Sequence, residues 1–350
     1  MYFFTVIISV LIRIITMFTK RIGLDLGTSN TVVFVQGKGI VINEPTVVAV
    51  SVEDRKILAV GKEAKEMIGK VPENIVSKRP LREGVIASYR LTEALIKYFI
   101  NKAVGGVRIL KPEIMISVPA GVTTVEERAV IEAAITAGAG NVYLLPEPIA
   151  AAVGAKLPIN TSAGNMIVNM GGGTTEIAVI SMNGIVSFDS ARIAGDVLND
   201  AIVSYVRKEH GLLIGEQMAE EIKVSIGSAI HMDSPLRTEI RGRDASSGMP
   251  KSMVITSNDA VEALTPALKQ ILSAIRRVLE RTPPELAADV IDRGMILSGG
   301  TAQLRGIDEL FTKAIGVPAH VADEPLFCVV RGTIEALDHL DIIKRSLRGS

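Results

Sequence analysis

The sequence predicts an α/β protein with two related lobes, and three observations lead to this prediction. With 350 residues the chain is long for a single hydrophobic core, so two lobes are expected. After residue 20, short apolar runs typical of strands alternate with segments of helical periodicity. A glycine-rich strand–turn–strand pattern occurs twice, at residues 22–31 and 167–176. This internal repetition predicts two lobes of one plan that face a common cleft.

Composition narrows the class of protein. Apolar residues make up 48% of the chain and charged residues 22%, which favours a folded protein over a disordered one. Lys plus Arg and Asp plus Glu both total 38, and this balance does not indicate a nucleic-acid partner. Cys328 is the single cysteine, so an intramolecular disulfide is impossible and a reducing cytoplasm is the simpler compartment. The histidines lack metal-ligand spacing, and we expect no zinc site.

The first segment is expected to lie outside the folded core. Residues 2–18 are almost wholly apolar, and a helix of this length spans about 26 Å, less than the roughly 30 Å of a bilayer core. The polar exceptions recur at helical spacing on one narrow stripe: Thr5, Ser9, Arg13, Thr16 and Lys20. We therefore expect residues 1–19 to form an amphipathic helix that lies in the membrane interface.

Two alternatives stay open for this segment. A membrane-spanning helix would place Arg13 near the bilayer centre, which costs roughly 2.5–3.5 kcal/mol. The chain could also start at Met17, which leaves a compact protein without the apolar segment. A secretory signal peptide is disfavoured, because early positive charge and a small-residue cleavage site are both missing.

The elements that follow residue 20 are predicted from their hydrophobic periodicity. Apolar runs predict strands at 21–26, 31–36, 40–42, 114–118, 166–170, 177–181 and 295–297. Helical spacing of apolar residues predicts helices at 92–102, 125–137, 194–207, 218–230 and 258–280. Strands interleaved with helices in this way favour an α/β architecture.

The two glycine-rich hairpins predict a phosphate site. Gly27 in the first turn, and Gly171, Gly172 and Gly173 in the second, allow the backbone to approach an anion closely. Threonine hydroxyls and exposed backbone N–H groups add donors, at positions 28, 31, 174 and 175. Asp25 lies where the first strand opens into its turn, so its carboxylate is placed to meet a phosphate-bound Mg²⁺.

The sequence contains no Walker motif, the loop-to-helix arrangement that binds phosphate in many nucleotide-binding proteins. Residues 61–70 have the glycine and lysine spacing of a Walker motif, but Val71 follows where Ser or Thr is required. The sequence therefore favours phosphate binding by two hairpins.

Four signatures then resemble the superfamily of actin, Hsp70 chaperones and sugar kinases. They are DLGT at 25–28, LPEPIAAA at 145–152, GGGTTE at 171–176 and LSGGTA at 297–302. From Lys20 onward the chain resembles in detail the MreB family of bacterial actin homologues, with further matching stretches at 43–49, 79–80, 84–87 and 283–287. The resemblance implies a fold of two actin-like (ribonuclease H-like) lobes around a central nucleotide cleft.

The resemblance also implies roles for individual residues, with ATP and Mg²⁺ as cofactors. The residues implied are Thr28, Ser29, Asn30, Gly171, Gly172, Gly173 and Thr174 for the phosphates, Glu220, Glu221, Ile222 and Lys223 for the ribose side, and Gly299, Gly300, Thr301 and Ala302 for the adenine side. Asp25 is implied at the metal. Glu147 matches the residue that positions the attacking water, and flanking prolines hold it stiffly. The alternative for Glu147 is an exposed loop acid.

Two positions depart from the family pattern. Asn169 stands where the family carries Asp, and an amide keeps the shape of that side chain without its negative charge. Our hypothesis is that ATP still binds while Mg²⁺ affinity or hydrolysis is reduced, so that the chain is at most a weak ATPase. Ser88 also replaces a usual Asp, and the sequence offers no account of its effect.

The resemblance implies a surface role as well. The loop 108–111 resembles a membrane-inserting tip; alternatively, its two apolar residues begin the next strand and are buried. The resemblance implies a homopolymer whose protofilaments pair antiparallel. It also implies that this polymer is peripherally bound to the inner face of the cytoplasmic membrane. The implied partners are membrane proteins of cell elongation and peptidoglycan synthesis.

We therefore expect three parts: the helix 1–19, one actin-like lobe formed by 20–157 with 320–350, and a second formed by 158–319. The expected function is ATP-dependent assembly of a membrane-associated filament that organises cell-wall synthesis and maintains rod shape, with slow hydrolysis coupled to polymer dynamics. The alternatives are a small-molecule kinase or an Hsp70-like ATPase, for which the sequence shows no substrate-pocket insertion and no peptide-binding domain.

Overall fold

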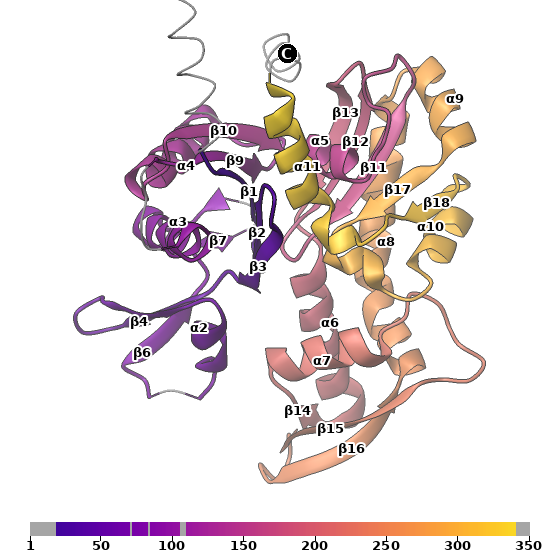
Figure 1. The fold of residues 1–350 in the computed structure, drawn as a ribbon. Helices are drawn as coiled ribbons and strands as arrows, with labels where there is room; N and C mark the ends of the chain where they lie inside the picture. Colours follow the sequence, from indigo (N-terminus) through magenta and orange to yellow (C-terminus); the bar gives the residue numbers. More distant parts are fainter. Residues whose placement is uncertain (1–18, 71, 83–84, 106–109, 341–350) are drawn as a thin grey trace, which may run out of the picture. The chain divides into compact units, whose positions relative to one another are not determined.

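The computed structural model describes residues 19–340, except 71, 83–84 and 106–109 (Figure 1). The expected amphipathic helix lies outside the described residues but for Thr19, and so do Arg108 and Ile109 of the expected membrane-inserting loop. Within the described ranges, no helix is both long and apolar enough to cross a bilayer.

The chain divides into two compact units. Unit 1 contains residues 19–118, Val122–Pro146 and Thr333–Leu340, and unit 2 contains Pro119–Gly121 and Glu147–Gly332. The sequence pattern places the corresponding bounds at 157/158 and 319/320, and where the functional lobes divide stays a prediction.

A five-stranded sheet forms the centre of unit 1. Its strands are β1 (Arg21–Leu26), β2 (Asn30–Val35), β3 (Gly39–Pro45), β9 (Glu113–Val118) and β10 (Asn141–Pro146), in the order β10-β9-β1-β2-β3. The pairs β1–β2 and β2–β3 are antiparallel, whereas β1–β9 and β9–β10 are parallel. Apolar residues of this sheet share one core with the helices α3 (Tyr89–Val104) and α4 (Thr124–Thr136).

A second, smaller sheet belongs to unit 1 and is absent from the sequence prediction. It has the order β5-β4-β6, from β4 (Val48–Ser51), β5 (Ile57–Val60) and β6 (Ile75–Lys78), and its small core includes Ala64 of α2 (Lys62–Glu66). The short strands β7 (Leu81–Arg82) and β8 (Val85–Ile86) form a separate pair. Each strand of these sheets has two to four residues, which is too short for a periodicity signal.

Unit 2 repeats the sheet plan of unit 1. Its strands are β11 (Asn165–Met170), β12 (Thr175–Ser181), β13 (Gly184–Ala191), β17 (Met295–Ser298) and β18 (Ala319–Val321), in the order β13-β12-β11-β17-β18. Again the first three strands in sequence are antiparallel neighbours, and two later strands add in parallel. The predicted α/β fold of two related halves is therefore confirmed in topology.

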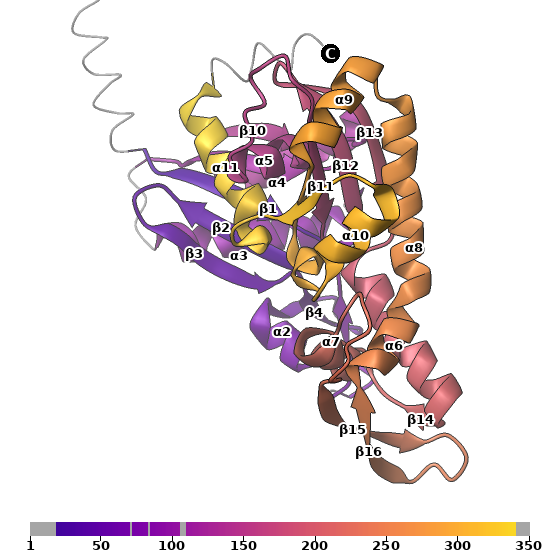
Figure 2. The same ribbon diagram turned by 90° about the vertical axis from the view of Figure 1, so that its right-hand side faces the viewer.

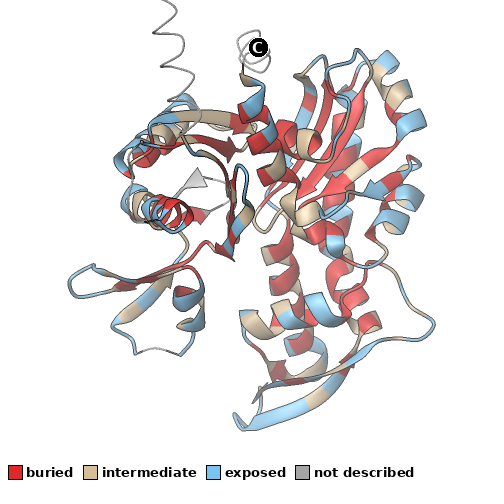
Figure 3. Cartoon of the chain, in the orientation of Figure 1, coloured by how far each residue is buried: buried red, intermediate tan, exposed pale blue. Residues whose placement is uncertain are grey.

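Helices complete unit 2. They are α5 (Glu147–Gly154), α6 (Gly195–His210), α7 (Glu216–Ile226), α8 (Ser257–Arg281), α9 (Pro284–Arg293) and α10 (Ile307–Ile315), and α11 (Cys328–Asp338) runs from unit 2 into unit 1. Figure 2 shows α8 lying along the sheet, where Leu264, Leu268 and Ile271 enter the core cluster. A capping box between Thr256 and Asp259 begins α8. Buried residues concentrate on the strands of the central sheets and on the helix faces that meet them (Figure 3).

The predicted helices all differ from the structure in their bounds, and the largest difference at one end is that of α7. The pattern predicts 218–230, whereas α7 covers Glu216–Ile226. The helix ends at Gly227, because the chain then turns to place Ser228 beside Arg305 in an isolated bridge. A third small sheet, β14 (Leu212–Leu213), β15 (Arg237–Asp244) and β16 (Pro250–Thr256), lies next to α7 and was not predicted either.

Candidate functional site

The first glycine-rich turn, in unit 1, connects β1 to β2 and is held by one buried threonine. Thr46 donates its hydroxyl to the carbonyl oxygen of Gly27 at 2.7 Å, and its backbone N–H donates to the carbonyl oxygen of Ser29 at 2.9 Å. Its hydroxyl oxygen also lies 2.8 Å from that of Thr31. A Cβ at Gly27 would lie 2.6 Å from the carbonyl oxygen of Asn30, so the turn requires glycine. Two carbonyls of the turn are thus bound inside the protein, which favours an approaching anion.

Asp25 is half-buried on β1 directly before this turn. Its Oδ1 accepts a hydrogen bond from the Ser117 hydroxyl on β9 at 3.0 Å. Burial raises the pKa of the Asp25 carboxyl to about 6, and the hydrogen bond from Ser117 opposes this rise. A cation beside the carboxylate would lower this pKa and favour the charged form. This is the chemistry expected of a ligand to Mg²⁺ or to its bound water.

The second glycine-rich turn, in unit 2, connects β11 to β12. Its carbonyls are also bound within the protein: Gly171 O accepts from Gly195 N–H at 3.2 Å, and Gly172 O accepts from Asp196 N–H at 2.8 Å. Both donors belong to the first turn of α6. The structure therefore packs the start of α6 against the turn and fixes the turn's backbone.

Residues predicted for the ribose and adenine sides meet this second turn or the start of α6 that packs against it. Lys223 on α7 donates its Nζ to Gly195 O at 2.8 Å, and the Thr301 hydroxyl donates to Gly171 O at 2.8 Å. A Cβ at Gly195 would lie 3.2 Å from both Lys223 Nζ and Thr301 Oγ1. Three segments that are far apart in the sequence therefore converge on one point within unit 2.

The remaining predicted residues of α7 and of the loop after β17 differ in what they expose. Ile222 and Ala302 are buried in the core, so only their backbones are available to a ligand. Glu221 is exposed, and Glu220 is half-buried. Gly299 has φ +86°, and a Cβ there would overlap the backbone of Met170. The loop from Gly299 to Ala302 therefore packs directly on the end of β11.

Asn169 and Glu176 are direct neighbours across the β11–β12 pair. Asn169 Oδ1 accepts the Ser298 hydroxyl at 3.0 Å, and Glu176 Oε1 accepts Ala120 N–H at 3.2 Å. Glu176 Oε2 is buried without a hydrogen-bond partner among the described residues. Burial raises the pKa of Glu176 to about 7, against the opposing effect of Ala120 N–H. Glu176 was predicted only as part of the GGGTTE signature, although an acid at the start of a buried strand is a signal in itself.

Glu147 is the first residue of α5 and is half-buried rather than an exposed loop acid. Its helix is fixed against α11 through two glycines. A Cβ at Gly154 would overlap the carbonyl of Cys328, and one at Gly332 would overlap the carbonyl of Ala150. This close helix packing within unit 2 sets the position of Glu147.

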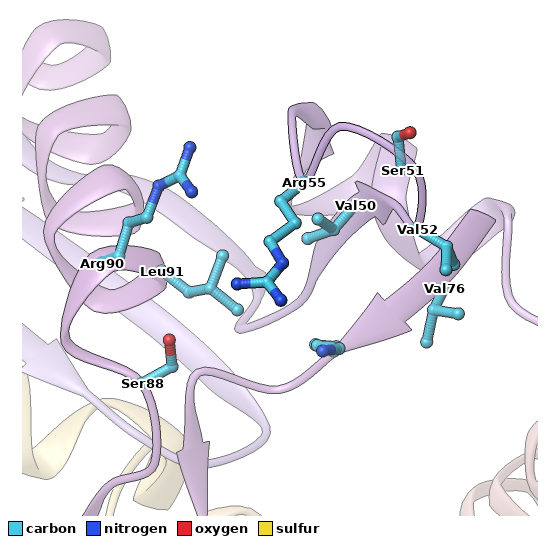
Figure 4. A pocket seen from close by; sticks show the side chains of 9 residues that line it. Val50, Ser51, Val52, Arg55, Val76, Ser88, Arg90 and Leu91 are labelled. Atoms are coloured by element: carbon cyan, nitrogen blue, oxygen red, sulfur yellow. The ribbon is translucent and has the colours of Figure 1, made fainter. Parts of the chain in front are cut away.

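Ser88 is the N-cap residue of α3 in unit 1 and is not part of the first glycine-rich turn. It lines a cavity of about 510 Å³ with residues of β4, of the turn after it, of β6 and of α3 (Figure 4). Besides Ser88, the lining residues are Val50, Ser51, Val52, Arg55, Val76, Lys78, Arg90 and Leu91. The charged lining residues are all cations, so an Asp at position 88 would have been the one acid in this wall.

Comparison with known proteins identifies the relatives of the chain. The family model for MreB/Mbl protein matches residues 19–345. The cell shape-determining protein MreB of Pasteurella multocida (strain Pm70) is 48% identical over 334 residues, covering 93% of this chain and 95% of that protein. The cell shape-determining protein Mbl of Bacillus subtilis (strain 168) is 47% identical over 332 residues, covering 95% of this chain and all of that protein (100%).

Solved structures agree in fold. Crystal structures of MreB5 of Spiroplasma citri bound to ADP and to AMPPNP are each 35% identical with a TM-score of 0.88. The ADP complex covers 92% of this chain and 97% of that one, and the AMPPNP complex covers 95% and 99%. The MamK double helical filament, at 20% identity, has a TM-score of 0.77 over 91% of this chain and 99% of that one, and shows the actin-like fold alone. The chain belongs to the MreB/Mbl protein family.

Proposed function

We propose that this chain is an ATP-dependent, actin-like filament protein that maintains rod cell shape. The observation that carries the proposal is the pair of glycine–threonine turns, one in each of two sheets of the same topology, whose carbonyls are bound within their own units. Family membership supports it, because the relatives at 47–48% identity are named cell shape-determining proteins. MreB5 of Spiroplasma citri, at 35% identity, has been solved with ADP and AMPPNP.

The nucleotide is proposed to contact both turns. Backbone N–H groups and hydroxyls of residues 28–30 and 171–174 would bind its phosphates, as the family resemblance implies. Lys223 and Thr301 support the second turn through their contacts with Gly195 and Gly171. A nucleotide held by both units stabilises whichever arrangement of the units binds it better, and so can couple ATP to assembly.

Mg²⁺ fits the residues present in each unit. Asp25 Oδ and the unpartnered Glu176 Oε2 are carboxylate oxygens, the donor type that Mg²⁺ and its waters prefer. When bound, the ion would neutralise charge on the β- and γ-phosphates. Glu147 at the start of α5 is proposed to orient the attacking water, with slow hydrolysis because Asn169 lacks a charge.

Membrane attachment is proposed to come from residues 1–19 and the loop 108–111 acting together. Each is a weak anchor, and polymerisation multiplies weak anchors by raising their effective concentration. The filament would then lie at the inner face of the cytoplasmic membrane and organise the membrane proteins of cell elongation and peptidoglycan synthesis.

Co-sedimentation with liposomes tests this function. The full chain is mixed with anionic phosphatidylglycerol liposomes with ATP and Mg²⁺, and the pellet is imaged by electron microscopy. We expect paired filaments on the lipid only when ATP is present. Neutral liposomes and nucleotide-free samples serve as controls. ATP turnover without any polymer, on lipid or in solution, would favour the kinase or chaperone-type alternative.

A further inference from the structure

A single carboxylate oxygen is buried without a partner in the part of the chain that the structure describes: Oε2 of Glu176. The Glu176 side chain is only 1% exposed, so water outside the protein does not satisfy this oxygen. Its other oxygen, Oε1, accepts the backbone N–H of Ala120 at 3.2 Å. Buried polar atoms are normally paired, and an unpaired one indicates a bound water or ion at that place, or a functional role.

The position of Glu176 indicates which kind of partner its Oε2 would bind. Glu176 is the second residue of β12, directly after the Gly171–Thr174 turn, and it is the cross-strand neighbour of Asn169. Directly opposed residues of an antiparallel pair project from the same face, with Cβ atoms about 4.5–5.5 Å apart. Glu176 therefore presents its carboxylate on the same face as Asn169, beside the proposed phosphate turn.

Asn169 is a weaker acceptor for a metal-bound water than a carboxylate. Its neutral Oδ1 already accepts the Ser298 hydroxyl at 3.0 Å, which leaves it one lone pair, and its other terminal group is an NH₂, which only donates. Water bound to Mg²⁺ presents its hydrogens outward and requires an acceptor, and Mg²⁺ usually keeps several such waters. On this face of the β11–β12 pair, Glu176 Oε2 is a carboxylate acceptor without a hydrogen-bond partner among the described residues.

We propose that Glu176 is a positioning residue that accepts a hydrogen bond from a water of the nucleotide-bound Mg²⁺, the role that the family resemblance assigns to a carboxylate at position 169. The proposal rests on the proposed function, because it requires Mg²⁺ and nucleotide at the second turn. Burial disfavours the charged form of Glu176 and raises its pKa to about 7, which a cationic partner at Oε2 would reverse.

The substitution Glu176→Gln tests this role with little change of shape. Its amide oxygen can still accept Ala120 N–H, while an NH₂ donor replaces Oε2. The measurement is a Mg²⁺ titration of the fluorescence of a bound methylanthraniloyl-ATP, at constant nucleotide. We expect the half-saturating Mg²⁺ concentration to rise about 10–100-fold, as for other residues that orient metal ligands. Nucleotide affinity measured in EDTA is expected to change less than about twofold, because it does not involve the metal.

A second substitution separates a positioning role from a structural one. Asn169→Asp in the Glu176→Gln background places a carboxylate directly opposite, and we expect it to restore most of the lost Mg²⁺ affinity. Glu176→Asp, which keeps the charge on a shorter side chain, is expected to give an intermediate half-saturating concentration and serves if the Gln variant does not fold.

Two results would overturn the inference, and they are distinguishable. If the variants bind nucleotide normally and their Mg²⁺ dependence equals that of the wild type, Glu176 is structural and the proposed function stands. If the wild type itself binds no nucleotide, with or without Mg²⁺, the proposed function fails and the inference fails with it.

Discussion

The packing of α5 against α11 predicts that Gly332→Ala destabilises unit 2 and also slows hydrolysis. A Cβ at Gly332 would overlap the carbonyl of Ala150, with the carbonyl carbon 2.6 Å away and Cα 2.9 Å away. All three are backbone atoms of α5, so no side-chain rotation relieves the overlap, and the helices must separate.

The magnitude follows from two opposing contributions. Overpacking of a tight contact costs up to about 3 kcal/mol. Alanine is better than glycine inside a helix by about 1 kcal/mol, which offsets part of this cost. The net loss is about 2 kcal/mol, or a decrease of about 4–8 °C in the melting temperature of a unit of this size.

The functional consequence depends on the position of Glu147. Because Glu147 begins α5, a shift of this helix moves the proposed water-positioning carboxylate, and a 1 Å misplacement can cost about a hundredfold in rate. We therefore expect a larger decrease in ATP turnover than in nucleotide affinity.

Thermal unfolding followed by circular dichroism, together with phosphate release, checks this prediction. Gly184→Ala is the matched control, because a Cβ there meets only Ser181 O at an ordinary 3.6 Å. A Gly332→Ala protein that melts at or above the wild-type temperature would refute the packing argument. If it melts lower but hydrolyses ATP at the wild-type rate, the link to Glu147 is wrong.

Three further predictions follow from the site. Asn169→Asp is expected to raise the rate of phosphate release, because it supplies the missing negative charge; an unchanged rate rejects this hypothesis. Thr46→Val keeps the side-chain shape but removes the hydroxyl that binds Gly27 O. We expect about tenfold weaker nucleotide binding and a loss of about 1–3 kcal/mol in unfolding free energy. Equal nucleotide binding by the variant and the wild type would contradict this prediction. Burial raises the pKa of Glu176 from 4.5 to about 7, so between these pH values the folded state binds more protons than the unfolded state. The free energy of unfolding therefore falls as the pH rises through this window, by about 3 kcal/mol in total. Urea unfolding without nucleotide at pH 5 and pH 8 checks the last prediction: Glu176→Gln should lose this part of the pH dependence, and an identical dependence in both proteins contradicts it.

Local patterns were sufficient for the central hairpins and for α3, α4, α6, α7 and α8, five of the ten α-helices in the described residues. The strands around both glycine-rich turns have the apolar runs and turn residues that define them, and α8 follows from apolar periodicity over 25 residues. Of the elements that were missed, β4 to β8 have only two to four residues and carry no periodicity, but longer ones such as β13, β15 and α9 were missed as well. The C-terminal end of α7 was predicted too far along, because the bridge of Ser228 to Arg305 is a contact between distant segments.

Residue types and their spacing were therefore enough to indicate an α/β chain with a repeated phosphate hairpin and an acid, Asp25, at its edge. The support of the second turn depended on tertiary structure, because Lys223 lies 28 residues from the Gly195 it binds and Thr301 lies 130 residues from Gly171. The same holds for the unpartnered oxygen of Glu176, since whether a buried carboxylate finds a donor depends on which distant backbone N–H groups the fold brings to it. Sequence periodicity reports the face on which a side chain lies, whereas its hydrogen-bond partners depend on how the chain packs.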